Sequence, residues 1–152
     1  QGATVPQPSA AEPAPAAPEG MVLLPSGRLS VQELMSVLNA LPFDITFVDA
    51  DDRVRYFSEG RERIFVRTRA VIGRSVQNCH PPRSLAAVQR ILDSFRAGGS
   101  DHADFWIRLG EKMVSIRYFA VRDAGGRYLG TLEVTQDITG IQKLQGEKRL
   151  LD

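Results

Sequence analysis

The side chains best suited to chemistry lie next to each other in the middle of the chain. Cys79 is the single cysteine, and His80, one of two histidines, follows it directly. A nucleophilic mechanism needs a nucleophile, a base and a group that orients the base. Neighbouring residues usually point in different directions, and spacing alone assigns no third member. A structural zinc site would need carboxylates to complete its four ligands. The sequence therefore predicts no catalytic residues and no enzyme.

Two other patterns that can hold ions are incomplete. Asp49, Asp51 and Asp52 resemble an acidic metal loop, but the glycine and the terminal glutamate of a calcium loop are missing. A solvated turn explains them better. The glycine pairs at 98–99 and 125–126 are typical of a helix stop and a hairpin turn, and they do not form a phosphate-binding loop.

The composition is that of one globular domain with a tail. The chain has 152 residues, of which 43% are hydrophobic and 24% charged. Its formal charge of +1 argues against nucleic acid as a partner, because such proteins usually carry a basic excess. No apolar run approaches the roughly 20 residues that span a bilayer, so we expect no membrane contact. A single cysteine forms no internal disulfide, which predicts a cytoplasmic location.

The two ends of the chain differ from its middle. Residues 1–28 are expected to be a Pro/Ala-rich disordered linker to an upstream domain, because five of the nine prolines fall in the first 20 residues. Residues 29–43 are expected to form a flanking amphipathic helix, since Ser30 and Glu33 have the spacing of a capping box. Residues 140–152 are expected to form an exit helix, with Ile141, Leu144 and Leu151 at heptad-like positions.

The middle of the chain alternates in the manner of β-strands. The segments with period-two alternation are 44–49, 54–57, 103–109, 114–121 and 128–135. A helix with Leu92 and Phe95 on its apolar face lies between the second and third of these segments. Short turns connect the last three strands, which implies an antiparallel meander. The predicted fold class is α+β: a five-stranded antiparallel sheet with helices on one face, flanked by N- and C-terminal amphipathic helices.

This element order resembles a PAS domain. The most specific motif is Asp137-Ile138-Thr139, at the junction of the last strand and the exit segment. Four further segments resemble the PAS module found C-terminal to hemerythrin-like domains in bacterial proteins. They span residues 44–49, 53–58, 77–82 and 118–123. The resemblance covers nearly everything after the linker, with a core over residues 44–139. It implies a sensory module with a cavity between sheet and helices, which relays its state through flanking helices.

The resemblance also implies where a ligand or cofactor would bind. The residues expected to line the cavity are His80, Cys79, Phe47, Leu92, Phe95 and Tyr118. His80 is a candidate ligand of haem iron, because haem-binding PAS domains take such a histidine from this region; it would otherwise cap the following helix or pack on the sheet. A flavin is disfavoured, since His80-Pro81-Pro82 and Glu133 replace the residues that would grip it.

Two functions from different classes remain. One is a non-catalytic sensory module that binds a small ligand, a cofactor or a partner domain, with haem-based gas or redox sensing through His80 as a variant. The other is a ligand-free dimerisation scaffold. A cavity of at least ~300 Å³ would favour the sensor. Both would form a homodimer through the flanking helices. Alternation places Phe105 and Trp106 on opposite faces, so one is expected to be buried and the other exposed or covered.

Overall fold

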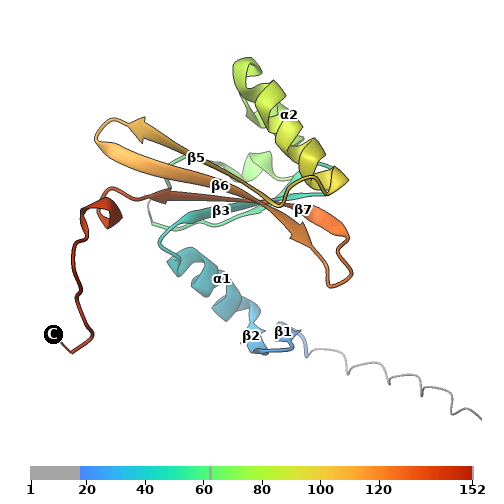
Figure 1. Cartoon of the computed structure of the whole chain (residues 1–152). Helices are drawn as coiled ribbons and strands as arrows, with labels where there is room; N and C mark the ends of the chain where they lie inside the picture. The colour runs from blue at the N-terminus through green and yellow to red at the C-terminus, as the bar shows by residue number, and fades with distance from the viewer. Residues whose placement is uncertain (1–17, 62, 152) are drawn as a thin grey trace, which may run out of the picture. The chain divides into compact units, whose positions relative to one another are not determined.

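The computed structural model describes residues 18–61 and 63–151 and divides the chain into two compact units, residues 1–36 and 37–152. Most of the predicted linker, residues 1–17, therefore lies outside the described residues. The described part of the first unit contains a hairpin and the start of a helix. The second unit contains the five-stranded sheet and the helix that packs on it (Figure 1).

Ordered structure begins earlier than the sequence predicts. The strands β1 (Met21–Leu24) and β2 (Gly27–Ser30) form an antiparallel hairpin, where residues up to 28 were expected to be linker. The four consecutive apolar residues of β1 are a strand signal that the proline-rich context hides. The helix α1 (Val31–Ala40) follows and begins with the predicted capping box. The Glu33 amide donates a hydrogen bond to the Ser30 hydroxyl oxygen at 3.0 Å, and the Ser30 amide donates one to the Glu33 carboxylate at 2.9 Å.

The second unit has the predicted antiparallel sheet, with strand order β4-β3-β7-β6-β5. The strands are β3 (Asp44–Asp49), β4 (Val54–Phe57), β5 (His102–Leu109), β6 (Lys112–Arg122) and β7 (Tyr128–Asp137). The last strand pairs with β3 and β6, so it lies at the centre of the sheet although it comes last in sequence. The predicted α+β class and meander are confirmed.

One face of this sheet, here called the inner face, is covered by α2 (Pro82–Ala97) (Figure 1). Proline at the first helical position and Gly98 at the end, with φ +77°, delimit the helix as predicted. The short 3₁₀ helices η1 (Arg69–Val71) and η2 (Val76–Cys79) precede it. The residues of the central core cluster are Val48, Val54, Val76 and Leu92. Burial of this apolar surface holds α2 on the sheet.

The predicted exit helix is wrong. After β7 the chain forms only the single 3₁₀ turn η3 (Ile141–Lys143), and Leu144 is already extended. Ile141, Leu144 and Leu151 are exposed. A helix of about a dozen residues is marginal in water without a partner for its apolar face, and none of the described residues supplies one.

The expectation for Phe105 and Trp106 is also wrong. Both are exposed, Phe105 at 41% and Trp106 at 70%. They do lie on opposite faces of β5, as alternation requires. However, β5 is an edge strand, so that its residues have sheet neighbours on one side only.

Gly130 makes a close backbone approach possible between β7 and β3. Its φ is +153°, and a Cβ atom built there would lie 2.1 Å from the Val48 carbonyl oxygen and 2.8 Å from the Phe47 ring. Only glycine fits at this point, because distances under 3.0 Å demand a backbone shift.

We therefore expect Gly130→Ala to lower the free energy of unfolding by about 3 kcal/mol, from backbone strain and overpacking together. Urea unfolding followed by circular dichroism measures the effect. Gly140→Ala is the matched control, because Gly140 has φ −67° and open space around its Cβ position. Equal unfolding midpoints for the two variants would contradict the close approach.

Candidate functional site

A small cavity lies between the inner face, η2 and α2. Its volume is about 30 Å³, room for about two water molecules. The residues that line it are Thr46, Val48, Val54, Arg67, Val76, His80, Val88, Ile91, Leu92, Tyr118, Thr131 and Glu133. Its position matches the predicted one, but it is about a tenth of the ~300 Å³ expected for a small-ligand site.

Three of the six predicted cavity residues line it: His80, Leu92 and Tyr118. Phe95 is fully buried but does not reach the cavity wall, and Cys79 packs against the core cluster. Phe47 packs against Gly130, and alternation along β3 puts it on the face opposite Thr46 and Val48.

The sequence did not predict the polar centre of the cavity. Arg67 Nη2 lies 3.2 Å from Glu133 Oε1, and the two side chains are only 15% and 12% exposed. The Nε atom of Arg67 is buried and has no hydrogen-bond partner among the described residues. The sequence signal that could have revealed the pair is Glu133 itself, a charged residue at an inward position of a central strand.

Tyr118 completes this polar centre. It lies opposite Glu133 in the β6–β7 register, and Thr46 lies opposite Glu133 on the other side. Burial, the negative charge of Glu133 and a hydrogen bond to it raise the pKa of Tyr118 well above its usual value. The phenol therefore stays protonated, and the Glu133 carboxylate interacts with both Tyr118 and Arg67.

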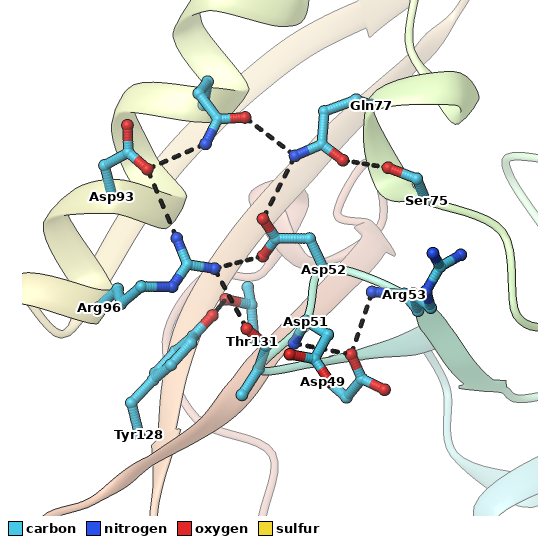
Figure 2. Close-up of polar contacts among 12 residues, drawn as sticks. Asp49, Asp51, Asp52, Arg53, Ser75, Gln77, Asp93, Arg96, Tyr128 and Thr131 are labelled. Carbon is cyan, nitrogen blue, oxygen red and sulfur yellow. Dashed lines mark hydrogen bonds and ion pairs between the residues drawn. The ribbon is translucent and has the colours of Figure 1, made fainter.

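A network of polar side chains fastens α2 to the turn between β3 and β4 (Figure 2). Arg96 Nη2 lies 2.7 Å from the Asp52 carboxylate, and Gln77 Nε2 donates to the other oxygen of Asp52 at 3.2 Å. Gln77 also donates to Gln89 on α2 at 2.9 Å. Asp52 adopts φ +60°, which aspartate tolerates better than most residues. This turn is thus a structural anchor for the helix that closes the cavity.

The junction after β7 is held by hydrogen bonds to β6. Thr139 donates to Asp137 Oδ1 through its amide at 3.0 Å and its hydroxyl at 2.6 Å. The Thr139 hydroxyl oxygen accepts the Met113 amide at 2.9 Å, and the Ile138 amide donates to the Met113 carbonyl at 2.8 Å. The hydrogen bonds from Thr139 lower the pKa of Asp137. The Asp137-Ile138-Thr139 motif is therefore a clamp: its hydrogen bonds hold the end of β7 against the start of β6.

A larger, open depression of about 450 Å³ lies beside this junction. Its lining includes Leu41 and Pro42 from the segment after α1, Lys112 at the start of β6, and Asp137. Residues from both ends of the sheet domain therefore line this depression.

The space beside His80 is too small for haem. The Nδ1 atom of His80 lies 3.0 Å from the Val76 carbonyl oxygen, one turn earlier in the chain. A porphyrin is far larger than the 30 Å³ that the cavity offers. The residues around His80 therefore do not fit haem in this arrangement, and His80 instead ties η2 to the start of α2.

Comparisons with known proteins agree with this fold. A family model described as a PAS domain matches residues 34–139. The solved C-terminal domain from Streptococcus mutans is 35% identical, with a TM-score of 0.77, and the match covers 82% of this chain and 97% of that one. The PAS domain of BvgS from Bordetella pertussis is 18% identical, with a TM-score of 0.54, covering 72% and 86%. A sensory box sensor histidine kinase from Vibrio cholerae is 14% identical, with a TM-score of 0.51, covering 70% and 89%. No curated protein matches.

The antiparallel sheet, the helix on its inner face and the small cavity between them define a PAS-type module. With the family model covering most of its length, the chain belongs to the PAS domain family. PAS domains are typically non-catalytic sensory modules, and they occur in histidine kinases. Within the described residues, no helix is long and apolar enough to cross a membrane.

The buried ion pair generates a stability prediction. Glu133→Leu leaves the Arg67 charge buried without its partner, which should cost about 3 kcal/mol in the free energy of unfolding. The double variant Arg67→Met with Glu133→Leu should cost less than the two single changes together. Urea unfolding of the four proteins gives this coupling free energy.

The exposed pair Arg69–Glu59 is the matched control, since its side chains are 82% and 51% exposed. Glu59→Ala should cost less than about 1 kcal/mol. Additive costs at Arg67 and Glu133 would show that the pair is not coupled.

The raised pKa of Tyr118 predicts a loss of stability in alkali. In the unfolded chain the phenol ionises near pH 10, whereas burial keeps it protonated in the folded chain. Above about pH 10 the unfolded state therefore binds fewer protons, and the free energy of unfolding falls as pH rises. Tyr118→Phe should flatten this decrease, measured by urea unfolding between about pH 8 and 11. The pKa values of Tyr56 and Tyr128 are also raised by burial, so part of the slope should remain. An unchanged slope in the variant would contradict the prediction.

Proposed function

We propose that this chain is a non-catalytic PAS sensory module that detects a small polar molecule at the Arg67–Glu133 pair. The observation that carries the proposal is the buried Nε–H of Arg67, which has no acceptor among the described residues, while the Arg67 side chain is one of those that line the cavity. A buried donor without a partner is costly. A ligand with a carbonyl or carboxylate oxygen would satisfy it.

The size of the cavity limits the ligand. A volume of about 30 Å³ admits a molecule of a few heavy atoms, and a larger one must displace apolar side chains of α2 such as Val88 and Ile91. Since the Asp52 network fastens the same helix to the β3–β4 turn, a displacement of α2 would be resisted at one end. Ligand size is therefore coupled to the position of α2.

The relay would run along β7. Glu133 binds Arg67 at the centre of this strand, and Asp137 forms the clamp with Thr139 at its end. A change in the charge or position of Glu133 would reach the clamp through four residues of one continuous strand. We propose that the flanking segments carry the signal to an upstream partner domain, of the hemerythrin-like kind that the sequence resembles, and that the protein acts in the cytoplasm as a homodimer.

The second candidate is the ligand-free dimerisation scaffold. The nearly filled core favours it, because the cavity is well below the ~300 Å³ of a usual small-ligand site. In that case the Arg67–Glu133 pair would serve only the fold.

An NMR titration separates the two candidates. The Nε–Hε resonance of Arg67 is followed while formate, a charged acceptor, and formamide, a neutral one, are added. We expect a saturable shift with at least one of them, with a dissociation constant no lower than about 0.5 mM, because a three-atom ligand gains at most about 1.5 kcal/mol per atom.

Arg67→Lys is the control variant, since it keeps a cation near Glu133 but lacks the Nε donor. In this variant the amide resonances of Glu133 and Tyr118 should no longer shift on titration. A shift that fails to saturate, or that sodium chloride reproduces, would reject the sensor at this pair and favour the scaffold.

A further inference from the structure

The outer edge of β5 has unpaired backbone groups at alternate residues. The Asp101 carbonyl accepts the Ala120 amide at 2.8 Å, and the β5–β6 register continues from there without a bulge. In an antiparallel pair, residues alternate between directing their N–H and C=O groups toward the partner strand and away from it. The residues of β5 that direct these groups away from β6 are His102, Asp104, Trp106 and Arg108.

The other edge of the sheet is protected. At β4 the Val54 amide donates to the Arg74 carbonyl at 3.0 Å, and the Gly73 amide donates to the Val54 carbonyl at 2.7 Å. In residues 18–61 and 63–151, no backbone or side-chain group is hydrogen-bonded to the outward groups of β5. An open edge of eight residues with exposed apolar side chains is a template for another strand.

The charges of β5 select one partner and one register. If two copies of β5 pair antiparallel about a twofold axis at Trp106, Asp104 of each copy lies opposite Arg108 of the other. The backbone N–H and C=O groups of Trp106 then form two hydrogen bonds with Trp106 of the second copy, which agrees with the outward direction of these groups. Moving the twofold axis by one residue in either direction removes both Asp–Arg pairs. Placing the axis at Asp104 would bring the two Asp104 side chains opposite each other.

The side chains fit this register on both faces. Phe105 lies opposite Ile107 of the second copy on the inner face, and both are exposed in the single chain. On the other face the two Trp106 side chains lie opposite each other between the two Asp–Arg pairs. Among the described residues, Asp104 has His102 as its only close ionic neighbour, at 3.8 Å, and Arg108 has none.

We propose that two copies of this chain associate through their β5 edges, forming a continuous ten-stranded antiparallel sheet centred on Trp106. The β5 edge would thus be the contact surface of the proposed homodimer, and its formation does not depend on ligand binding. In a twofold dimer the same surface of both copies must be complementary to itself. The β5 edge meets this requirement, because Asp104 and Arg108 lie two residues on either side of the axis at Trp106.

The test uses Trp106, the only tryptophan of the chain. Dilution of the whole chain should shift its emission as the dimer dissociates, and sedimentation equilibrium should give the same dissociation constant. Asp104→Arg and Arg108→Asp should each raise that constant at least about tenfold, because each opposes like charges at two places. The double variant, which restores both opposite-charge pairs, should return to within about threefold of the original.

Arg83→Asp, on the exposed start of α2, is the charge-change control and should leave the constant unchanged. Single cysteines in a Cys79→Ser background report the register: position 106 should cross-link, because directly opposite residues lie within disulfide reach. Positions 104 and 108 should not, since each lies roughly 13 Å from its copy in this register.

A chain that stays monomeric up to about 1 mM, or a double variant that dissociates as readily as the single ones, would overturn the proposal. So would cross-linking at 104 or 108 in preference to 106. Because the formate titration reads Arg67 and this test reads β5, either proposal can fail without the other.

Discussion

The packing of α2 on the inner face of the sheet is the constraint on which the rest of this structure depends. Leu92 and Phe95 are buried between helix and sheet, and Arg122 on β6 donates to the Phe95 carbonyl at 2.7 Å. The Asp52–Arg96 pair fastens the same end of the helix to the β3–β4 turn. One helix, attached at its C-terminal half by both apolar and polar contacts, therefore determines how large the cavity is.

The inner face combines this apolar packing with a charged centre. Glu133 lies on the central strand of the sheet and is compensated by Arg67 and Tyr118, which approach from different segments. Removing one of the two charges is costly, because it leaves the other buried and unpaired. This polar centre is the place where we propose that a small molecule acts.

The two edge strands of the sheet differ in whether other parts of the chain cover them. The short strand β4 is covered by the segment at Gly73 and Arg74, while the longer β5 is open and carries exposed aromatic and charged residues. Natural proteins usually protect such an edge by shortening, bulging or covering it. The open edge, with its pattern of opposite charges about Trp106, is therefore most simply explained as a contact surface. The proposed contact does not require the C-terminal exit helix that the sequence predicted and the structure lacks.

The sequence alone determined the elements whose signals are local. The alternation of β3 and β4, the capping box at Ser30 and Glu33, and the glycine stop of α2 at Gly98 act within a few residues, so they can be recognised without a fold. Only the tertiary structure decided which face of β3 meets α2, and hence that Phe47 lies outside the cavity. It also brought Arg67 to Glu133, 66 residues away, and left Ile141 and Leu144 exposed where an exit helix was expected. The physical reason is that burial and charge pairing depend on neighbours that are distant along the chain, and alternation cannot tell one face of a sheet from the other.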